Sequence, residues 1–165
     1  MSNALTITNK GDTEIVITRQ FDAPRHLVFE AMTVPALVRR WLLGPEGWSM
    51  PVCEINLSVG GHYRYEWLNA DGRTMGMGGT FREIVVPERI VHTELFDEDW
   101  TGGETLCTQE FVEAGACTTL VTTVIYSSTA ARDAALRSGM AGGMETGYAR
   151  LDAIFAERLA KEEAQ

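Results

Sequence analysis

The chain has 165 residues, enough for one domain with a sizeable hydrophobic core. Its 14 basic and 23 acidic residues leave a net charge of −9, which argues against a nucleic acid or an anionic membrane as a partner, because nothing would neutralise the phosphates. No apolar run approaches the roughly 18 residues of a membrane span, and no charged-then-apolar leader opens the chain, so we expect a cytoplasmic protein.

Segments of β-branched and aromatic residues, separated by turn-forming residues, predict a sheet of six to seven antiparallel strands. The segments are residues 14–21, 48–57, 62–68, 73–86, 89–96, 104–112 and 118–126. After the first of them, apolar residues at helical spacing predict two short helices, one over residues 24–32 and one that restarts at Pro35 and carries Trp41. Residues 97–103 read as an acidic loop that holds Trp100. The separation of these strands from a helical C-terminal third indicates an α+β fold, with residues 1–165 as a single domain.

The most informative segment is a predicted C-terminal helix over residues 128–161, which contains Gly139, Gly142, Gly143 and Gly147. Each glycine in a helix interior costs about 1 kcal/mol relative to alanine. We therefore expect a sheet or a ligand to approach the backbone of this helix closely. A long helix laid over a mostly β chain in this way predicts a cavity between helix and sheet.

Five motifs in chain order carry a family resemblance. They are Phe21-Asp22-Ala23-Pro24 with Val28-Phe29, Trp41-Leu42-Leu43-Gly44-Pro45, Gly60-Gly61-His62-Tyr63-Arg64-Tyr65, Pro87-Glu88-Arg89-Ile90-Val91, and Gly139-Met140 followed by Gly147-Tyr148-Ala149-Arg150-Leu151-Asp152. Over about residues 13–160 the chain resembles the START-like (SRPBCC) superfamily, and more narrowly the branch named for the activator of Hsp90 ATPase homologue 1. The resemblance implies a helix-grip fold, in which a curved antiparallel sheet wraps around a long C-terminal helix and leaves a mostly apolar cavity. Dimers through sheet edges or helix faces are common in this superfamily, so a homodimer is a further partner to test.

Two periodicities select the residues expected to line that cavity. Alternation places three aromatic residues of the strand 62–68 on one face, and helical spacing places two methionines and a tyrosine on the inward stripe of the long helix. The predicted ligand-binding residues are Trp41, Tyr63, Tyr65, Trp67, Met77, Phe81, Met140, Met144 and Tyr148. Among them, Trp41 is expected to close one mouth of the cavity. The alternative is that these side chains pack together as ordinary core.

Groups for catalysis are few. The chain carries no signature of a nucleophile elbow, a phosphate-binding loop, a zinc protease or a dinucleotide site, so we predict no catalytic residue, no metal and no cofactor. His26, His62 and His92 have no evident partner in the sequence and are expected to be structural or solvated. The three cysteines lack a CxxC spacing, which argues against a disulfide framework and a zinc site.

A reaction, if the protein catalyses one, would use cavity groups such as Tyr63, Tyr65, Gln109 or Glu110 on a polyketide-like substrate. The strand 104–112 leaves its inward face open, because alternation groups Glu110 with Leu106 and Thr108, and Gln109 with Cys107 and Phe111. Three functions follow. The favoured one is binding of a small hydrophobic or aromatic molecule, and the others are a polyketide cyclase/aromatase and an Hsp90-type chaperone activator or other protein-binding role.

Overall fold

The computed structural model describes residues 3–98 and 102–164, and Trp100 lies outside them. The described residues form an α+β fold with an eight-stranded sheet in the order β1-β2-β8-β7-β6-β5-β4-β3, in which every neighbouring pair is antiparallel. The strands are β1 (Thr6–Lys10), β2 (Glu14–Phe21), β3 (Trp48–Ile55), β4 (His62–Asn69), β5 (Thr74–Val85), β6 (Arg89–Phe96), β7 (Thr105–Ala114) and β8 (Cys117–Ile125). The helices are α1 (Arg25–Thr33), α2 (Pro35–Trp41), α3 (Thr129–Arg137) and α4 (Met140–Glu163).

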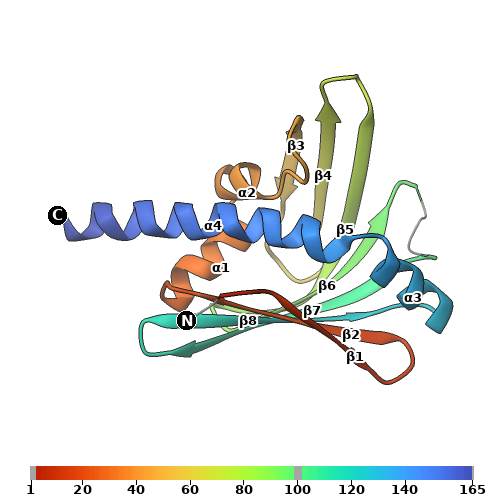
Figure 1. The fold of residues 1–165 in the computed structure, drawn as a ribbon, viewed down its shortest axis with the longest axis horizontal. Helices are drawn as coiled ribbons and strands as arrows, with labels where there is room; N and C mark the ends of the chain where they lie inside the picture. The colour runs from red at the N-terminus through yellow and green to blue at the C-terminus, as the bar shows by residue number, and fades with distance from the viewer. Residues whose placement is uncertain (1–2, 99–101, 165) are drawn as a thin grey trace.

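The sheet is strongly curved, and α4 lies across its concave side (Figure 1). Strands β3, β4 and β5 rise steeply from the layer that contains β1, β2, β7 and β8. The ladder is interrupted between Phe81 and Glu83 in β5 and between Ser49 and Val52 in β3. Such bulges increase the local twist and bend a sheet. The bend leaves room between the sheet and α4, and α1 and α2 fill only part of it.

The predicted number of six to seven strands is wrong by one edge strand. Strand β1 pairs with β2 through a hairpin in which Lys10 faces Glu14 across Gly11, whose φ is 59°. Its residues are mostly exposed, so the segment lacks the apolar pattern that marks the other strands. The two short helices therefore follow the second strand of the chain, not the first.

The long helix predicted over residues 128–161 is in fact two helices. Helix α3 begins as expected, because the backbone N–H of Ala131 donates to Ser128 Oγ at 3.0 Å. Helix α3 ends at Arg137, and Gly139 adopts the left-handed conformation with φ 81° before α4 starts at Met140. A glycine at this conformation ends a helix readily, so Gly139 is a break and not an interior residue.

Of the three glycines inside α4, only Gly147 marks a close approach. A Cβ at Gly147 would lie 3.2 Å from the carbonyl oxygen of Trp41, whereas a Cβ at Gly142 or Gly143 would meet open space. The close approach at Gly147 comes from Trp41 at the end of α2, and not from the sheet. Gly143 lines the pocket described below, so an approach of a ligand to the helix there stays a prediction.

This contrast gives a stability prediction. We expect Gly142→Ala to raise the free energy of unfolding by about 0.5–1 kcal/mol, through helix propensity and a less flexible unfolded chain. At Gly147 the same gain is opposed, since the new methyl group would press on Trp41 O at 3.2 Å and on Trp41 Cε3 at 3.3 Å. Urea unfolding of the two variants should therefore show a gain for Gly142→Ala and none for Gly147→Ala; equal gains would contradict the close approach.

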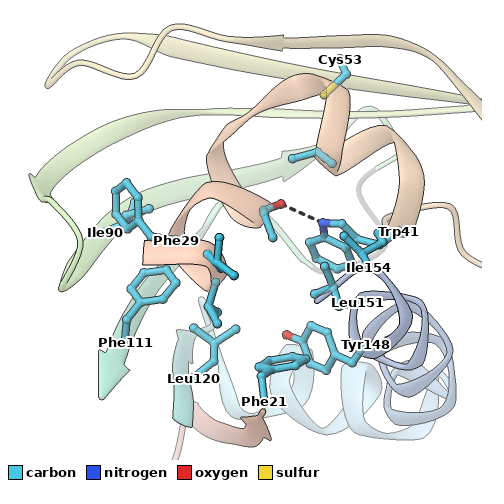
Figure 2. Close-up of a cluster of buried hydrophobic side chains, with 14 of the residues drawn as sticks. Phe21, Phe29, Trp41, Cys53, Ile90, Phe111, Leu120, Tyr148, Leu151 and Ile154 are labelled. Carbon is cyan, nitrogen blue, oxygen red and sulfur yellow. Dashed lines mark hydrogen bonds between the residues drawn. The ribbon is translucent and has the colours of Figure 1, made fainter. Parts of the chain in front are cut away.

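The main core joins α4 to β2 and α1. Phe21 of β2 packs edge-to-face against Tyr148 and Phe155 of α4, with ring centroids 5.3 and 5.6 Å apart. Figure 2 shows Tyr148 and Leu151 of α4 turned toward Phe21 and Trp41. Edge-to-face aromatic pairs stabilise beyond the area that they bury. This packing fixes the height of α4 above the sheet.

A buried arginine also fixes α4. Arg19 of β2 is only 3% exposed, and its guanidinium contacts Glu145 at 3.0 Å and Asp152 at 2.7 Å, both on α4. Its charged group also lies 4.9 Å from the centroid of the Phe21 ring. The paired carboxylates raise the pKa of Arg19 against the opposing effect of burial. Arg19 therefore links α4 to the sheet electrostatically, close to the Phe21 contacts.

Candidate ligand-binding pocket

A pocket of about 510 Å³ lies between the concave side of the sheet and α4. Its walls come from α2 and the loop after it, from β4 to β8, and from the first turns of α4. Most of the lining side chains are aromatic, methionine or aliphatic. The volume lies within the range of about 300–1,000 Å³ that is typical of small-molecule sites.

All nine residues named from the sequence lie on the wall of this one pocket. They are Trp41, Tyr63, Tyr65, Trp67, Met77, Phe81, Met140, Met144 and Tyr148. Seven of them are also buried core residues, while Met140 and Met144 on α4 are only partly buried. Cavity lining and core packing are therefore not alternatives here, because the same seven buried side chains belong to the core and line the pocket. That these residues bind a ligand stays a prediction.

Two indole N–H groups fix the part of the wall near α2. Trp41 Nε1 donates to the carbonyl oxygen of Ala31 at 2.8 Å, and Trp67 Nε1 donates to that of Leu42 at 2.7 Å (Figure 2 shows the first). Trp41 also packs against Tyr148, with 5.8 Å between the ring centroids. Trp41, which was expected to close one mouth of the cavity, is thus held in a fixed position in the pocket wall.

The two tyrosines of β4 differ in what their hydroxyl groups can do. The Tyr63 hydroxyl donates to the carbonyl oxygen of Thr93 at 2.6 Å and lies 3.2 Å from His92 Nδ1. The Tyr65 hydroxyl has no hydrogen-bond partner among the described residues. Burial raises the pKa of both phenols, so both stay neutral. Of the two hydroxyl groups expected to orient a ligand, only that of Tyr65 is available.

Polar side chains gather where β6, β7 and β8 meet the pocket. The polar lining residues there are His92, Glu94, Cys107, Gln109, Thr122 and Tyr126. The strand register brings them together, because His92 lies opposite Cys107, and Cys107 lies opposite Val124, two residues before Tyr126. The pocket therefore has a largely apolar body and one polar end.

The register also answers which face of β7 points inward. Cys107, Gln109 and Phe111 face the pocket or the core, and Gln109 lines the pocket. Glu110 is on the other face, where its carboxylate lies 3.6 Å from Arg89 Nη1. Glu110 is thus excluded as a cavity group, and Gln109 is the member of that pair that a ligand could reach.

Glu94 is the functional candidate that the sequence did not reveal. Its side chain lies in the pocket, and its one polar contact among the described residues is the Cys107 thiol, which points at Oε2 from 3.9 Å. Burial raises the pKa of Glu94 to about 7. The charge of Glu94, after burial itself, helps to raise the pKa of Tyr63 and of Tyr126, so these phenols face the same space.

A signal for Glu94 did exist in the sequence. Ile90, His92, Glu94 and Phe96 alternate along β6 and line the pocket together. However, the opposite face of β6 carries Val91 and Leu95, so the alternation alone did not show which set points inward. Only the pairing of β6 with β5 and β7 decides it.

The remaining candidates lie elsewhere or stay uncharged. His26 and His62 are exposed, and His62 Nδ1 lies 3.2 Å from Thr80 Oγ1. Burial lowers the pKa of His92, whose Nδ1 lies 3.2 Å from the carbonyl oxygen of Thr93. All three cysteines are free. Within residues 3–98 and 102–164 no group of three metal-ligating side chains comes together, and no helix is long and apolar enough to cross a membrane.

The curved sheet, the helix across it and the pocket between them define a helix-grip protein. The chain belongs to the family of activator of Hsp90 ATPase homologue 1-like proteins, whose family model matches residues 22–156. This confirms the resemblance drawn from the five sequence motifs. No curated protein matches the chain.

Solved structures give the same fold. The chain is similar to a protein from Rhodobacter sphaeroides at 36% identity, over 93% of this chain and 99% of that one, with a TM-score of 0.89. A protein from Staphylococcus epidermidis matches at 25% identity over 93% and 94% of the two chains, with a TM-score of 0.79. An AHSA1-like protein from Aeromonas hydrophila, at 19% identity over 84% and 93%, has a TM-score of 0.68 and supports the fold alone.

Proposed function

We propose that the protein binds a small, mainly apolar molecule in the pocket between the sheet and α4. The observation that supports this most is the pocket itself, about 510 Å³ in volume and walled by aromatic and methionine side chains. An apolar ligand gains from leaving water for such walls, and methionine adapts to ligands of different shape. The indole hydrogen bonds of Trp41 and Trp67 hold part of the wall in place before any ligand arrives.

The proposal is tested with N-phenyl-1-naphthylamine, an uncharged apolar fluorophore. We expect saturable binding in the micromolar range, seen as a rise in probe emission and as quenching of the protein's tryptophan fluorescence. A double variant, Met77→Trp with Met144→Trp, places two large rings in the pocket from opposite walls, on β5 and α4. We expect it to weaken probe binding at least about tenfold by occupying the space that the probe needs.

The matched control places the same side chains outside the pocket. Val59 and Val112 are 69% and 53% exposed, so Val59→Trp with Val112→Trp should leave probe binding unchanged. Urea unfolding of both double variants shows that each is folded. The proposal fails if the wild-type protein does not bind the probe saturably, or if the pocket variant binds it as well as the control does.

One observation favours a second candidate, an acid–base enzyme acting on a polyketide-like substrate. Glu94 and His92 share one face of β6 beside Cys107, so two ionisable groups reach one ligand. Turnover that Glu94→Gln abolishes, with probe binding retained, would separate this role from passive binding. The family description suggests a third hypothesis, that the protein activates an Hsp90-type chaperone. The test measures whether the protein raises the ATPase rate of purified Hsp90.

A further inference from the structure

The charged side chains that line the described part of the pocket are negative only. Glu94 is the only carboxylate among the described lining residues, and no lysine or arginine lines the pocket beside it. The two buried charged residues in the described part of the chain have partners, Arg19 in Glu145 and Asp152, and Arg132 in Asp133. A carboxylate deep in a protein without a cation or a strong hydrogen-bond donor is unfavourable, and native structures normally pair it. Glu94 therefore has no counter-charge among the described lining residues, and a cationic ligand could supply one.

Aromatic residues share the pocket with the carboxylate, and the charge of Glu94 helps to raise the pKa of Tyr63, Tyr65 and Tyr126, after burial itself. Tyr63 and Tyr65 lie side by side with ring centroids 5.1 Å apart, and Phe81 lies 5.5 Å from Tyr63. Tyr126 approaches the same space from the end of β8. The faces of such rings attract cations, and sites that bind organic ammonium ions combine several rings in this way. The surroundings of Glu94 thus suit a positive charge with bulky apolar substituents.

A second polar group at this end also lacks a partner. Thr122 of β8 is 8% exposed, its side chain lines the pocket, and its hydroxyl oxygen makes no hydrogen bond. The Tyr148 hydroxyl on α4 lies close enough to Thr122 to interact with it, although the pair lacks good hydrogen-bonding geometry. Buried hydroxyl groups are nearly always paired, so the Thr122 hydroxyl can still accept a better-placed partner from a ligand. Thr122 and Gln109 can bind the polar atoms that adjoin a ligand's charged group.

An anionic ligand does not fit the same site. It would bring a second negative charge toward Glu94, and no arginine or lysine among the described lining residues would offset it. The chain as a whole, with a net charge of −9, would also repel it at long range. Both effects favour a cation over a carboxylate of the same shape.

We propose that the ligand is an apolar molecule that carries an organic ammonium group, with the ammonium beside Glu94 and the tyrosine rings and the apolar body along the methionine and tryptophan wall. This rests on the proposed function and names the chemical class of its ligand. Burial raises the pKa of Glu94 to about 7, so the affinity for such a ligand should depend on pH near neutrality. Affinity for a permanently charged ammonium ion should rise as pH increases through 7, because Glu94 then becomes a carboxylate.

The other titratable groups that face Glu94 do not reverse that direction. Burial raises the pKa of the Cys107 thiol on β7 and of the phenols Tyr63 and Tyr65 on β4, so all three are neutral near pH 7. The same holds for Tyr126 after β8 and Tyr148 on α4. His92, on the same strand as Glu94, has its pKa lowered by burial and is also neutral there.

The test compares three naphthylalkyl probes that differ only in the end group: trimethylammonium, its uncharged tert-butyl isostere, and a carboxylate. Isothermal titration at pH 8 should show the ammonium probe binding at least about tenfold more tightly than the tert-butyl probe, and the carboxylate probe most weakly. At pH 5.5 the preference for ammonium should largely disappear. In Glu94→Gln it should be lost at both pH values, whereas Glu110→Gln on the outer face should keep it.

The outcomes separate this inference from the function on which it rests. If the tert-butyl probe binds as tightly as the ammonium probe to the wild-type protein, the pocket binds apolar molecules and the inference is wrong. The inference is equally wrong if Glu94→Gln retains the preference, or if the carboxylate probe binds best. If no probe binds, the proposed function itself is overturned. The comparison of probes on the wild-type protein holds whether or not a variant folds.

Discussion

Replacement of both acidic partners of Arg19, Glu145→Ala with Asp152→Ala, is expected to lower the free energy of unfolding by about 3–4 kcal/mol. The guanidinium lies almost fully buried on β2 and contacts both carboxylates of α4, at 3.0 and 2.7 Å. Without them it would stay buried, and the carbonyl oxygen of Gln20 would be its one remaining acceptor among the described residues. The backbone N–H of Leu5, which donates to Glu145 at 3.2 Å, would lose its acceptor as well.

Urea unfolding followed by circular dichroism measures this effect. The control is Glu157→Ala, which removes a carboxylate of α4 that pairs at the surface with Arg40 and Lys161 and should leave stability nearly unchanged. Adding Arg19→Met to the double variant should restore much of the loss, since an apolar side chain then replaces a stranded cation. If the double variant and the control lose the same stability, Arg19 does not depend on its partners.

The sequence predicted the parts of the site in which strand alternation or helical spacing leaves only one face that can point inward. In β4 the residues Tyr63, Tyr65 and Trp67 alternate with polar His62, Arg64 and Glu66, so only one face could turn inward. In α4 the stripe that includes Met144 and Tyr148 faces the sheet in the same way.

The parts that could not be predicted depend on pairing between distant strands. Strand β6 has apolar residues on both faces, so the inward position of Glu94 follows from the register of β6 against β7, in which Glu94 lies opposite Thr105. Strand β1 is polar and is a strand only because β2 offers it a free edge. From the sequence, Gly139 was expected inside one long helix, whereas in the structure its left-handed conformation ends α3.

The second large effect is a fall in stability with rising pH that depends on Glu94. Burial raises its pKa from 4.5 to about 7 in the folded protein, so between these values the folded state holds a proton that the unfolded state has released. Stability falls with pH wherever the folded state binds more protons. The full shift corresponds to at most about 3 kcal/mol, and water in the pocket reduces the expected loss to about 1–2 kcal/mol between pH 5 and pH 8.

Glu94→Gln removes the titrating group and keeps a side chain of similar shape. We therefore expect the variant to be more stable than the wild-type protein at pH 8 by about 1–2 kcal/mol and to differ little from it at pH 5. Urea unfolding at four pH values from 5 to 8 provides the measurement, and Glu110→Gln, which removes a carboxylate from the outer face of β7, is the control. A variant that is less stable than the wild-type protein at pH 8 would contradict the raised pKa.

The difference between wild type and variant is more informative than either curve. His92 is buried neutral with a lowered pKa, so its own contribution is lost as pH falls below about 6.5, opposite in direction to that of Glu94. The carboxylates with lowered pKa values, Asp22, Asp97 and Glu157, lose their contributions only at more acidic pH. All of these are common to both proteins and cancel in the difference. A trimethylammonium ligand should reverse the sign of that difference at pH 8, because it stabilises the carboxylate of Glu94 and has no equivalent partner in Glu94→Gln.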